Sequence, residues 1–276
     1  PVSRENLLQP SANDWLMFSR TYDAQRYSPL NQITRANVGQ LRQVWSRGID
    51  PGPQEHIPLV RDGVLFTLIP GGLQALDATN GDLLWEFKRP ANGRPGRTMA
   101  IFEDLIIYAA PDSTIVAVDA LTGKLKWYFQ AVHHDLWDYD ATAAPQLVTV
   151  KHDGKMVDAV AQASKQGFLY VFDRVSGKPL WPIDERPTPK SDVPGEQTSP
   201  TQPFPTAPPP FTRQKVVPSD VNPYLLTREE RANWKDRIAS ARGGLFMPPS
   251  LQAETISMPG ARGGANWGVT AAVPPK

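Results

Sequence analysis

A threefold internal repeat constrains the fold of this chain more than any other feature. An apolar, β-branched stretch followed by Asp-x-x-x-Gly-x-x-x-Trp occurs at residues 73–85, 115–127 and 169–181. In each copy the aspartate can open a turn by accepting backbone amides, and the glycine can supply the left-handed residue that closes it. A further strand is expected ahead of two copies, at 62–67 and 103–108. Each copy therefore predicts a small antiparallel sheet of propeller-blade size.

The tryptophans that end the repeats, Trp85, Trp127 and Trp181, are expected to pack between neighbouring blades. We therefore predict an all-β fold, a β-propeller, in a single domain over residues 1–276. An ordinary β-sandwich with recurring hairpins is the alternative, but three matches to one three-point frame favour the propeller.

Two segments interrupt the repeat pattern. Residues 182–223 are dense in proline, which cannot donate an amide to a sheet, so we expect an extended strap over the propeller face. A docking peptide for an aromatic groove is the less favoured interpretation. Residues 227–242 begin with the capping box Thr227-Arg-Glu-Glu230 and predict a short surface helix, with Trp234 and Ile238 as its apolar stripe.

Composition excludes several classes of function. The 276 residues contain 29 Lys and Arg against 28 Asp and Glu, and this near-neutral balance argues against nucleic acid as a partner. The absence of cysteine excludes disulfides, thiolate zinc sites and a cysteine nucleophile, and the four histidines form no His-x-x-x-His pair. No apolar run is long enough to span a membrane. The first residues lack the features of a signal peptide, as expected of either a mature end or a cytosolic start.

The densest polar cluster is His133-His-Asp-Leu-Trp-Asp-Tyr-Asp140. In a strand, Asp138 and Asp140 would face the same side, and two close carboxylates could share a hard divalent or trivalent cation. Taken alone, the two aspartates are about as well explained as turn caps or solvated charges. Lys165, at the start of the third repeat, is by itself most simply a solvent-facing lysine.

Four stretches resemble the pyrroloquinoline quinone (PQQ) dehydrogenases, most closely the membrane-type glucose dehydrogenase branch. They are residues 133–140, 163–174, the opening 13–33 and the glycine-rich 259–268. The resemblance implies a propeller-type quinoprotein that oxidises an alcohol or sugar hydroxyl. It also implies PQQ with Ca²⁺ or a lanthanide as cofactors, a quinone or cytochrome as electron acceptor, and a periplasmic location for the mature form.

The resemblance also implies roles for three residues of the polar cluster. Asp138 would be the catalytic base and a metal ligand, and the metal would act as a Lewis acid. Asp140 matches the extra acidic position of lanthanide-using members, but the glucose dehydrogenase branch has an acid there as well. Lys165 would hydrogen-bond the reactive quinone oxygen and stabilise its developing negative charge.

Four further residues match cofactor-binding positions of the family. Glu55 and Arg97 would contact the carboxylates or ring of PQQ, and an arginine suits a carboxylate because it binds through two parallel hydrogen bonds. Asn266 and Trp267 would lie at the rim of the cofactor.

The sequence departs from the family in what it lacks. About eight blades are usual, whereas only three clear repeats with two partial flanks are present, and nothing matches the family's metal-ligating Glu and Asn, its stacking Trp or its vicinal disulfide. A shortened propeller enzyme is the favoured interpretation. The alternatives are a non-catalytic propeller remnant that acts as a binding or scaffold module, and a portion of a longer protein. An incomplete ring exposes blade edges, so we also expect a homo-oligomer.

Overall fold

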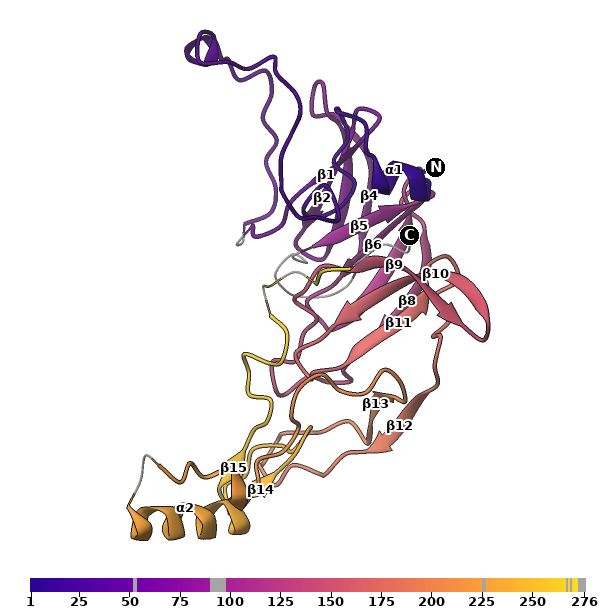
Figure 1. Cartoon of the computed structure of the whole chain (residues 1–276). Coiled ribbons are helices and arrows are strands. Elements are labelled where there is room, and N and C mark those ends of the chain that lie inside the picture. Colours follow the sequence, from indigo (N-terminus) through magenta and orange to yellow (C-terminus); the bar gives the residue numbers. More distant parts are fainter. Residues whose placement is uncertain (52–53, 90–97, 225–226, 267, 269, 273–276) are drawn as a thin grey trace.

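The computed structural model describes residues 1–276 except 52–53, 90–97, 225–226, 267, 269 and 273–276 (Figure 1). Three antiparallel sheets follow one another along the chain, and within each sheet every strand pairs with the next strand in sequence. The first sheet comprises β1 (Leu59–Arg61), β2 (Val64–Ile69), β3 (Gly72–Asp77) and β4 (Leu83–Lys88). The second comprises β5 (Met99–Phe102), β6 (Leu105–Ala109), β7 (Thr114–Asp119) and β8 (Leu125–Gln130). The third comprises β9 (Gln146–His152), β10 (Lys155–Ala163) and β11 (Leu169–Asp173).

The repeated turn forms as predicted. After β7, the Asp119 carboxylate accepts the amides of Leu121 and Thr122 at 3.0 and 2.9 Å. Gly123 has φ +70° and donates its amide to the Asp119 carbonyl. The turns after β3 and β11 are built in the same way, on Asp77 and Asp173. Each turn reverses the chain within five residues.

Tryptophans join each sheet to the next. The Trp85 indole of β4 donates to the Ala120 carbonyl at 3.0 Å, and its ring covers Gly123 so closely that a Cβ there would lie 2.6 Å from the indole. Trp127 of β8 contacts Gly177 of the third sheet in the same manner. The predicted packing of these two tryptophans between neighbouring sheets is confirmed. The turn glycine is required both for its left-handed φ and for this close approach.

Two other tryptophans differ from the sequence-based expectation. Trp45 lies in the segment before β1 and covers Gly81 of the first sheet, so it is a third joint of the same kind. The repeat did not reveal it, because no Asp-x-x-x-Gly turn precedes it. Trp181 instead makes an edge-to-face contact with His152 of β9, with ring centroids 5.1 Å apart. Trp181 therefore packs within its own sheet.

The centre of the core is the second sheet. Nearly every side chain of β5, β6 and β7 is buried. Arg174, in the turn after β11, is also buried and lies over the Phe102 ring of β5, 3.4 Å from its centroid, with its charge paired to Asp158 of β10 at 3.0 Å. Burial lowers the pKa of this arginine despite its carboxylate partner. Its aliphatic stem and planar head thus tie the third sheet to the second.

The proline-rich segment contains a two-stranded hairpin, which the expectation of an extended strap did not include. β12 (Ile183–Pro187) pairs with β13 (Thr201–Pro205). The Thr206 amide donates to the Pro182 carbonyl, and the Thr188 amide donates to the Pro200 carbonyl. Every second facing pair of the hairpin, counted from these two pairs, is therefore in a hydrogen-bonding position. Pro187, Pro203 and Pro205 lie in the alternate facing pairs, which exchange no backbone hydrogen bonds. Prolines at such positions leave the ladder intact.

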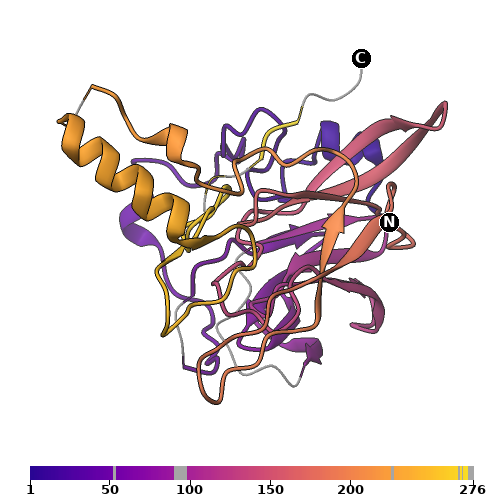
Figure 2. The same cartoon turned by 90° about the horizontal axis from the view of Figure 1, so that it is seen from below.

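The predicted helix is present as α2 (Arg228–Ser240), capped by Thr227 and Glu230. Trp234 is 44% exposed, so the expected apolar stripe does not pack against a core. α2 stands apart from the three sheets in both views (Figures 1 and 2). The remaining elements are short: α1 (Arg4–Leu8), η1 (Val38–Gln40), η2 (Pro218–Asp220), and the parallel pair β14 (Arg242–Gly243) and β15 (Thr255–Ile256). Within the described ranges, no helix is long and apolar enough to cross a membrane.

Candidate active site

The predicted catalytic motif forms an irregular turn between the second and third sheets. No residue from 131 to 140 is in a ladder, so strand alternation is not what brings Asp138 and Asp140 to the same side. The Asp135 carboxylate organises the turn by accepting the amides of Trp137 and Tyr139 at 2.8 and 2.7 Å. Burial raises the pKa of Asp135 above its usual range, although the two amide hydrogen bonds act in the opposite direction.

Aromatic packing fixes the far half of this turn. The buried rings of Trp137 and Tyr139 both lie edge-on to Phe246, with centroids 5.2 and 5.8 Å away. The Trp137 indole donates to the Met247 carbonyl at 2.9 Å, and the Tyr139 hydroxyl donates to the Pro259 carbonyl. These contacts leave the side chain of Asp138, between the two rings in sequence, 69% exposed.

Lys165 meets both aspartates of the turn. It lies just after β10 and is buried, and its ammonium is 2.8 Å from Asp138 Oδ2 and 2.7 Å from Asp140 Oδ1. The interpretation of Lys165 as a solvent-facing lysine is therefore wrong. Burial acts to lower the pKa of Lys165, but the hydrogen bonds and charges of the two carboxylates outweigh it and raise the pKa.

The glycine-rich stretch near the C-terminus packs directly on Lys165. Gly263 has φ +71°, and a Cβ at this position would lie 2.4 Å from Lys165 Cβ. The Gly264 amide donates to the Lys165 carbonyl at 2.9 Å. Asn266, a predicted cofactor contact, donates to the Arg262 carbonyl at 2.8 Å. Segments distant in sequence thus meet at one lysine.

Of the other three predicted cofactor contacts, Glu55 alone lies among the described residues. Glu55 is exposed and lies in the segment before β1, next to His56, which contacts Thr67 of β2. Its place at a cofactor stays a prediction. Arg97 and Trp267 lie outside the described residues.

An open pocket of about 480 Å³ adjoins Asp138. Asp112, from the turn between β6 and β7, lines it and receives two hydrogen bonds from Arg89, at 3.0 and 2.7 Å. Gln130, His134 and Asp135 add further polar groups. Sequence reasoning missed Asp112 and Gln130, because no motif marks them and only the fold brings them to Asp138.

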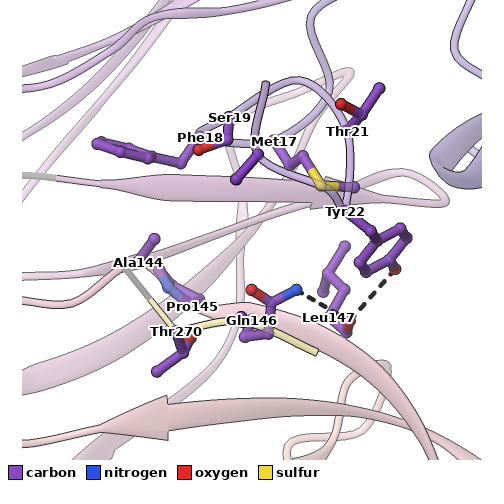
Figure 3. Close-up of a pocket in the computed structure, with 12 residues that line it drawn as sticks. Met17, Phe18, Ser19, Thr21, Tyr22, Ala144, Pro145, Gln146, Leu147 and Thr270 are labelled. Carbon is purple, nitrogen blue, oxygen red and sulfur yellow. Dashed lines mark hydrogen bonds between the residues drawn. The ribbon is translucent and has the colours of Figure 1, made fainter. Parts of the chain in front are cut away.

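A second pocket has no comparable chemistry. It measures about 50 Å³ and lies between residues 17–24 and 144–147, with mostly apolar walls (Figure 3). Tyr22 closes one side by donating its hydroxyl to the Leu147 carbonyl at 3.2 Å. Its size and lining are those of a packing gap.

The residues present fit part of a hard-cation site. Asp138 and Asp140 converge on one point that now holds the Lys165 ammonium, so a positive charge is favoured there. Ca²⁺ takes six to eight oxygen ligands. In the part of the chain that the structure describes, no group of three His, Asp or Glu side chains could complete such a shell. Two carboxylates would therefore be a fraction of the ligands, and the same ammonium offers a partner for an anionic or carbonyl oxygen.

Comparison with known families identifies the chain. A family model described as "PQQ: Glucose/ethanol/alcohol dehydrogenase, beta-propeller domain" matches residues 15–103 and 109–276. The chain belongs to this PQQ dehydrogenase family. The predicted family and the predicted all-β propeller class are both confirmed. The described strands form three sheets of three or four strands and two smaller two-stranded sheets.

Individual relatives of the PQQ family match part of the chain. Quinate/shikimate dehydrogenase (quinone) of Acinetobacter baylyi is 39% identical over 159 residues, which cover 57% of this chain and 19% of the relative. Quinoprotein glucose dehydrogenase of Gluconobacter oxydans is 40% identical over 162 residues, or 58% of this chain and 20% of the relative. The chain thus spans about a fifth of the length of these curated relatives.

Two solved structures resemble the fold. A quinohemoprotein alcohol dehydrogenase from Pseudomonas putida HK5 aligns with a TM-score of 0.54 and 28% identity, over 71% of this chain and 30% of that chain. A europium-containing methanol dehydrogenase aligns with a TM-score of 0.54 and 26% identity, over 64% and 33%.

Proposed function

We propose that this chain serves PQQ-dependent oxidation of an alcohol or sugar hydroxyl. The observation that carries the proposal is the buried Lys165 ammonium held by Asp138 and Asp140 beside an open pocket. A carboxylate and an ammonium in direct contact supply a proton acceptor and a positive charge at one place. Oxidation of a hydroxyl needs both, because a proton leaves oxygen while negative charge develops on the group that accepts the hydride.

In this proposal each residue has one task. PQQ would supply the quinone that accepts the hydride. Asp138 would take the hydroxyl proton on its carboxylate, which is exposed to the pocket. Lys165 would orient that carboxylate and offer its ammonium to the quinone oxygen. Its burial and its contact with Gly263 hold the ammonium in a fixed direction.

The cofactor contacts form the finer part of the proposal. Asp138 and Asp140 would hold Ca²⁺ or a lanthanide, which supplies a Lewis acid. Glu55, Arg97, Asn266 and Trp267 would contact PQQ. Electrons would pass to a quinone or a cytochrome in the periplasm.

The charge of the pocket bears on the substrate. Asp112, Asp135 and Asp138 line it together, and the charge of Arg89 is engaged by Asp112. Such a lining disfavours an anionic substrate and favours a neutral one with several hydroxyl groups. We therefore expect glycerol or a sugar to be oxidised in preference to a hydroxy acid such as quinate.

Dye-linked oxidation tests the proposal. The purified protein is loaded with PQQ and either Ca²⁺ or La³⁺, and PQQ binding is followed by fluorescence quenching. We expect saturable PQQ binding and reduction of the dye by glycerol or glucose, with a lower rate on quinate. PQQ binding without dye reduction on any substrate would contradict the catalytic proposal.

A non-catalytic module is the second candidate. It is favoured by the small number of sheets and by a cation site with only two carboxylates among the described residues. This candidate predicts a folded protein that binds no PQQ with either ion. The same titration therefore separates the two candidates.

A further inference from the structure

Gln202 makes an unusual contact with the turn that carries Asp138. It lies on β13 with its side chain fully buried. Its Oε1 accepts the His133 amide at 2.8 Å, and its Nε2 donates to the His133 carbonyl at 2.6 Å. One side-chain amide thus satisfies both backbone polar groups of a single residue, as a neighbouring strand would do.

The second strand of the same hairpin contacts the same residue. The His133 ring lies with Nε2 3.0 Å from Glu185 Oε1 of β12 and Nδ1 3.0 Å from Gln130 Oε1 of β8. His133 follows the end of β8 by three residues, where the chain leaves the second sheet. Both strands of the proline-rich hairpin therefore hold the start of the turn.

The lysine side is tied to the same place. Gln166, next to Lys165, donates its side-chain amide to the Ala131 carbonyl at 3.1 Å. The buried Tyr170 hydroxyl lies 3.3 Å from the Ala131 carbonyl and 3.1 Å from the Pro203 carbonyl. The start of the turn, the lysine segment and β13 thus meet in one buried hydrogen-bonded group.

We propose that Gln202 is a positioning residue that sets the distance between the Asp138 carboxylate and the Lys165 ammonium. Asp135 and the aromatic rings fix the far half of the turn, and Gln202 fixes its near end. Without Gln202 the part-buried amide and carbonyl of His133 would lose their partner, and we expect the turn to shift toward water to regain hydrogen bonds. Asp138 would then move relative to Lys165, because Gly263 and Gly264 provide further contacts that hold the lysine in place.

Gln202→Met tests this inference, because methionine keeps the length and fills the space without hydrogen bonding. The readout is the ¹H–¹⁵N signal of the Lys165 ammonium, assigned by its disappearance in Lys165→Met. We expect Gln202→Met to shift this signal or broaden it beyond detection. Gln74→Met is the matched control. Gln74 is a buried glutamine of β3 that donates to Glu86 at 2.6 Å, and we expect its loss to leave the ammonium signal unchanged.

Only the catalytic consequence rests on the proposed function. In the PQQ-loaded protein we expect Gln202→Met to lower kcat by about 10- to 100-fold, the range typical of a misplaced catalytic group, with KM changed less than about twofold. If the ammonium signal moves but neither protein turns over a substrate, the proposed function fails and the positioning role stands.

Two outcomes would overturn the inference. One is an unchanged Lys165 signal in folded Gln202→Met. If that variant does not fold, amide hydrogen exchange of the unmutated protein decides instead. The His133 amide should be strongly protected, and exchange at the rate of an exposed loop would show that the contact with Gln202 does not form.

Discussion

At the scale of single residues, Asp138 combines exposure with an uncommon backbone. Its φ is +61°, a left-handed conformation that aspartate and asparagine tolerate better than most residues. Asp138→Asn therefore removes the carboxylate while keeping the shape of the turn. We expect it to lower PQQ-dependent dye reduction at least ~100-fold, the usual scale for loss of a general base.

Asp153→Asn provides the control for Asp138→Asn. Asp153 also has positive φ, at +47°, and its side chain is 90% exposed in the turn between β9 and β10. The same substitution there should leave the rate unchanged. Steady-state kinetics at saturating PQQ measure both variants, and wild-type turnover by Asp138→Asn would remove Asp138 from the mechanism.

His56 predicts how stability depends on pH. Burial lowers the pKa of His56 below its usual value, and its Nε2 lies 2.7 Å from Thr67 Oγ1. Below about pH 6.5 the unfolded chain therefore binds a proton at position 56 more readily than the folded protein does. The free energy of unfolding should fall as the pH is lowered from 7.5 to 5.5. His56→Gln should reduce this slope in urea unfolding, and an identical slope in both proteins would contradict the assignment.

Sequence motifs predicted which residues meet at the candidate site, and the catalytic and metal-binding roles of these residues stay predictions. Asp138, Asp140 and Lys165 were predicted from sequence, and the structure brings them together. Gln202 was not predicted, because a glutamine between threonine and proline carries no signal of its role. Its importance arises from a contact across 69 positions of the chain, which only the folded protein reveals.

At the scale of elements, the turn glycines test how the sheets are joined. Gly123→Ala would place a Cβ 2.6 Å from the Trp85 ring, and Gly154→Ala, at φ +78°, would meet no atom within 4 Å. Both variants bear the left-handed strain, about 1–2 kcal/mol. Gly123→Ala should lower the free energy of unfolding by about 1–3 kcal/mol more, the cost of overpacking.

Urea unfolding of the two glycine variants isolates the contribution of the tryptophan. The m value should stay the same in both, because the surface exposed on unfolding does not change. Equal destabilisation by the two substitutions would mean that the Trp85 side chain moves aside at no cost in free energy and does not hold the sheets together.

Secondary structure was predictable wherever a repeat or a cap specified it, as at α2 and at the three Asp-x-x-x-Gly turns. The hairpin of β12 and β13 was missed because proline content was weighed without its spacing. Pro203 and Pro205 are two residues apart, so both lack an amide donor on the same edge of β13, the edge that does not pair with β12. Such spacing is compatible with a strand, whereas consecutive prolines are not.

At the scale of the whole molecule, an extended apolar segment predicts self-association. Large apolar side chains between residues 24 and 50 are solvent-exposed, namely Tyr27, Leu30, Ile33, Val38, Leu41, Val44 and Ile49. Contiguous exposed apolar surface promotes association. We expect light scattering to report a mass above 30.5 kDa as the protein concentration is raised from about 1 to about 100 μM, the range in which weak association occurs.

Val44→Ser with Leu41→Ser is the test of that surface. The two side chains are 83% and 56% exposed, so replacing them should reduce association without unfolding the protein. A monodisperse 30.5 kDa species at every concentration, for the unmutated protein, would refute the expectation of an oligomer.

The tryptophan joints have a consequence for how such a chain changes over evolution. Trp45, Trp85 and Trp127 each fit a glycine turn of the same design in the following sheet. The tryptophan and the glycine turn are alike at each of these three joints. If a whole sheet were inserted or deleted, the tryptophan of one flanking sheet would therefore still fit the glycine turn of the next. We therefore expect the insertion or deletion of a whole sheet to disturb the fold less than a substitution of the tryptophan or the glycine within one joint.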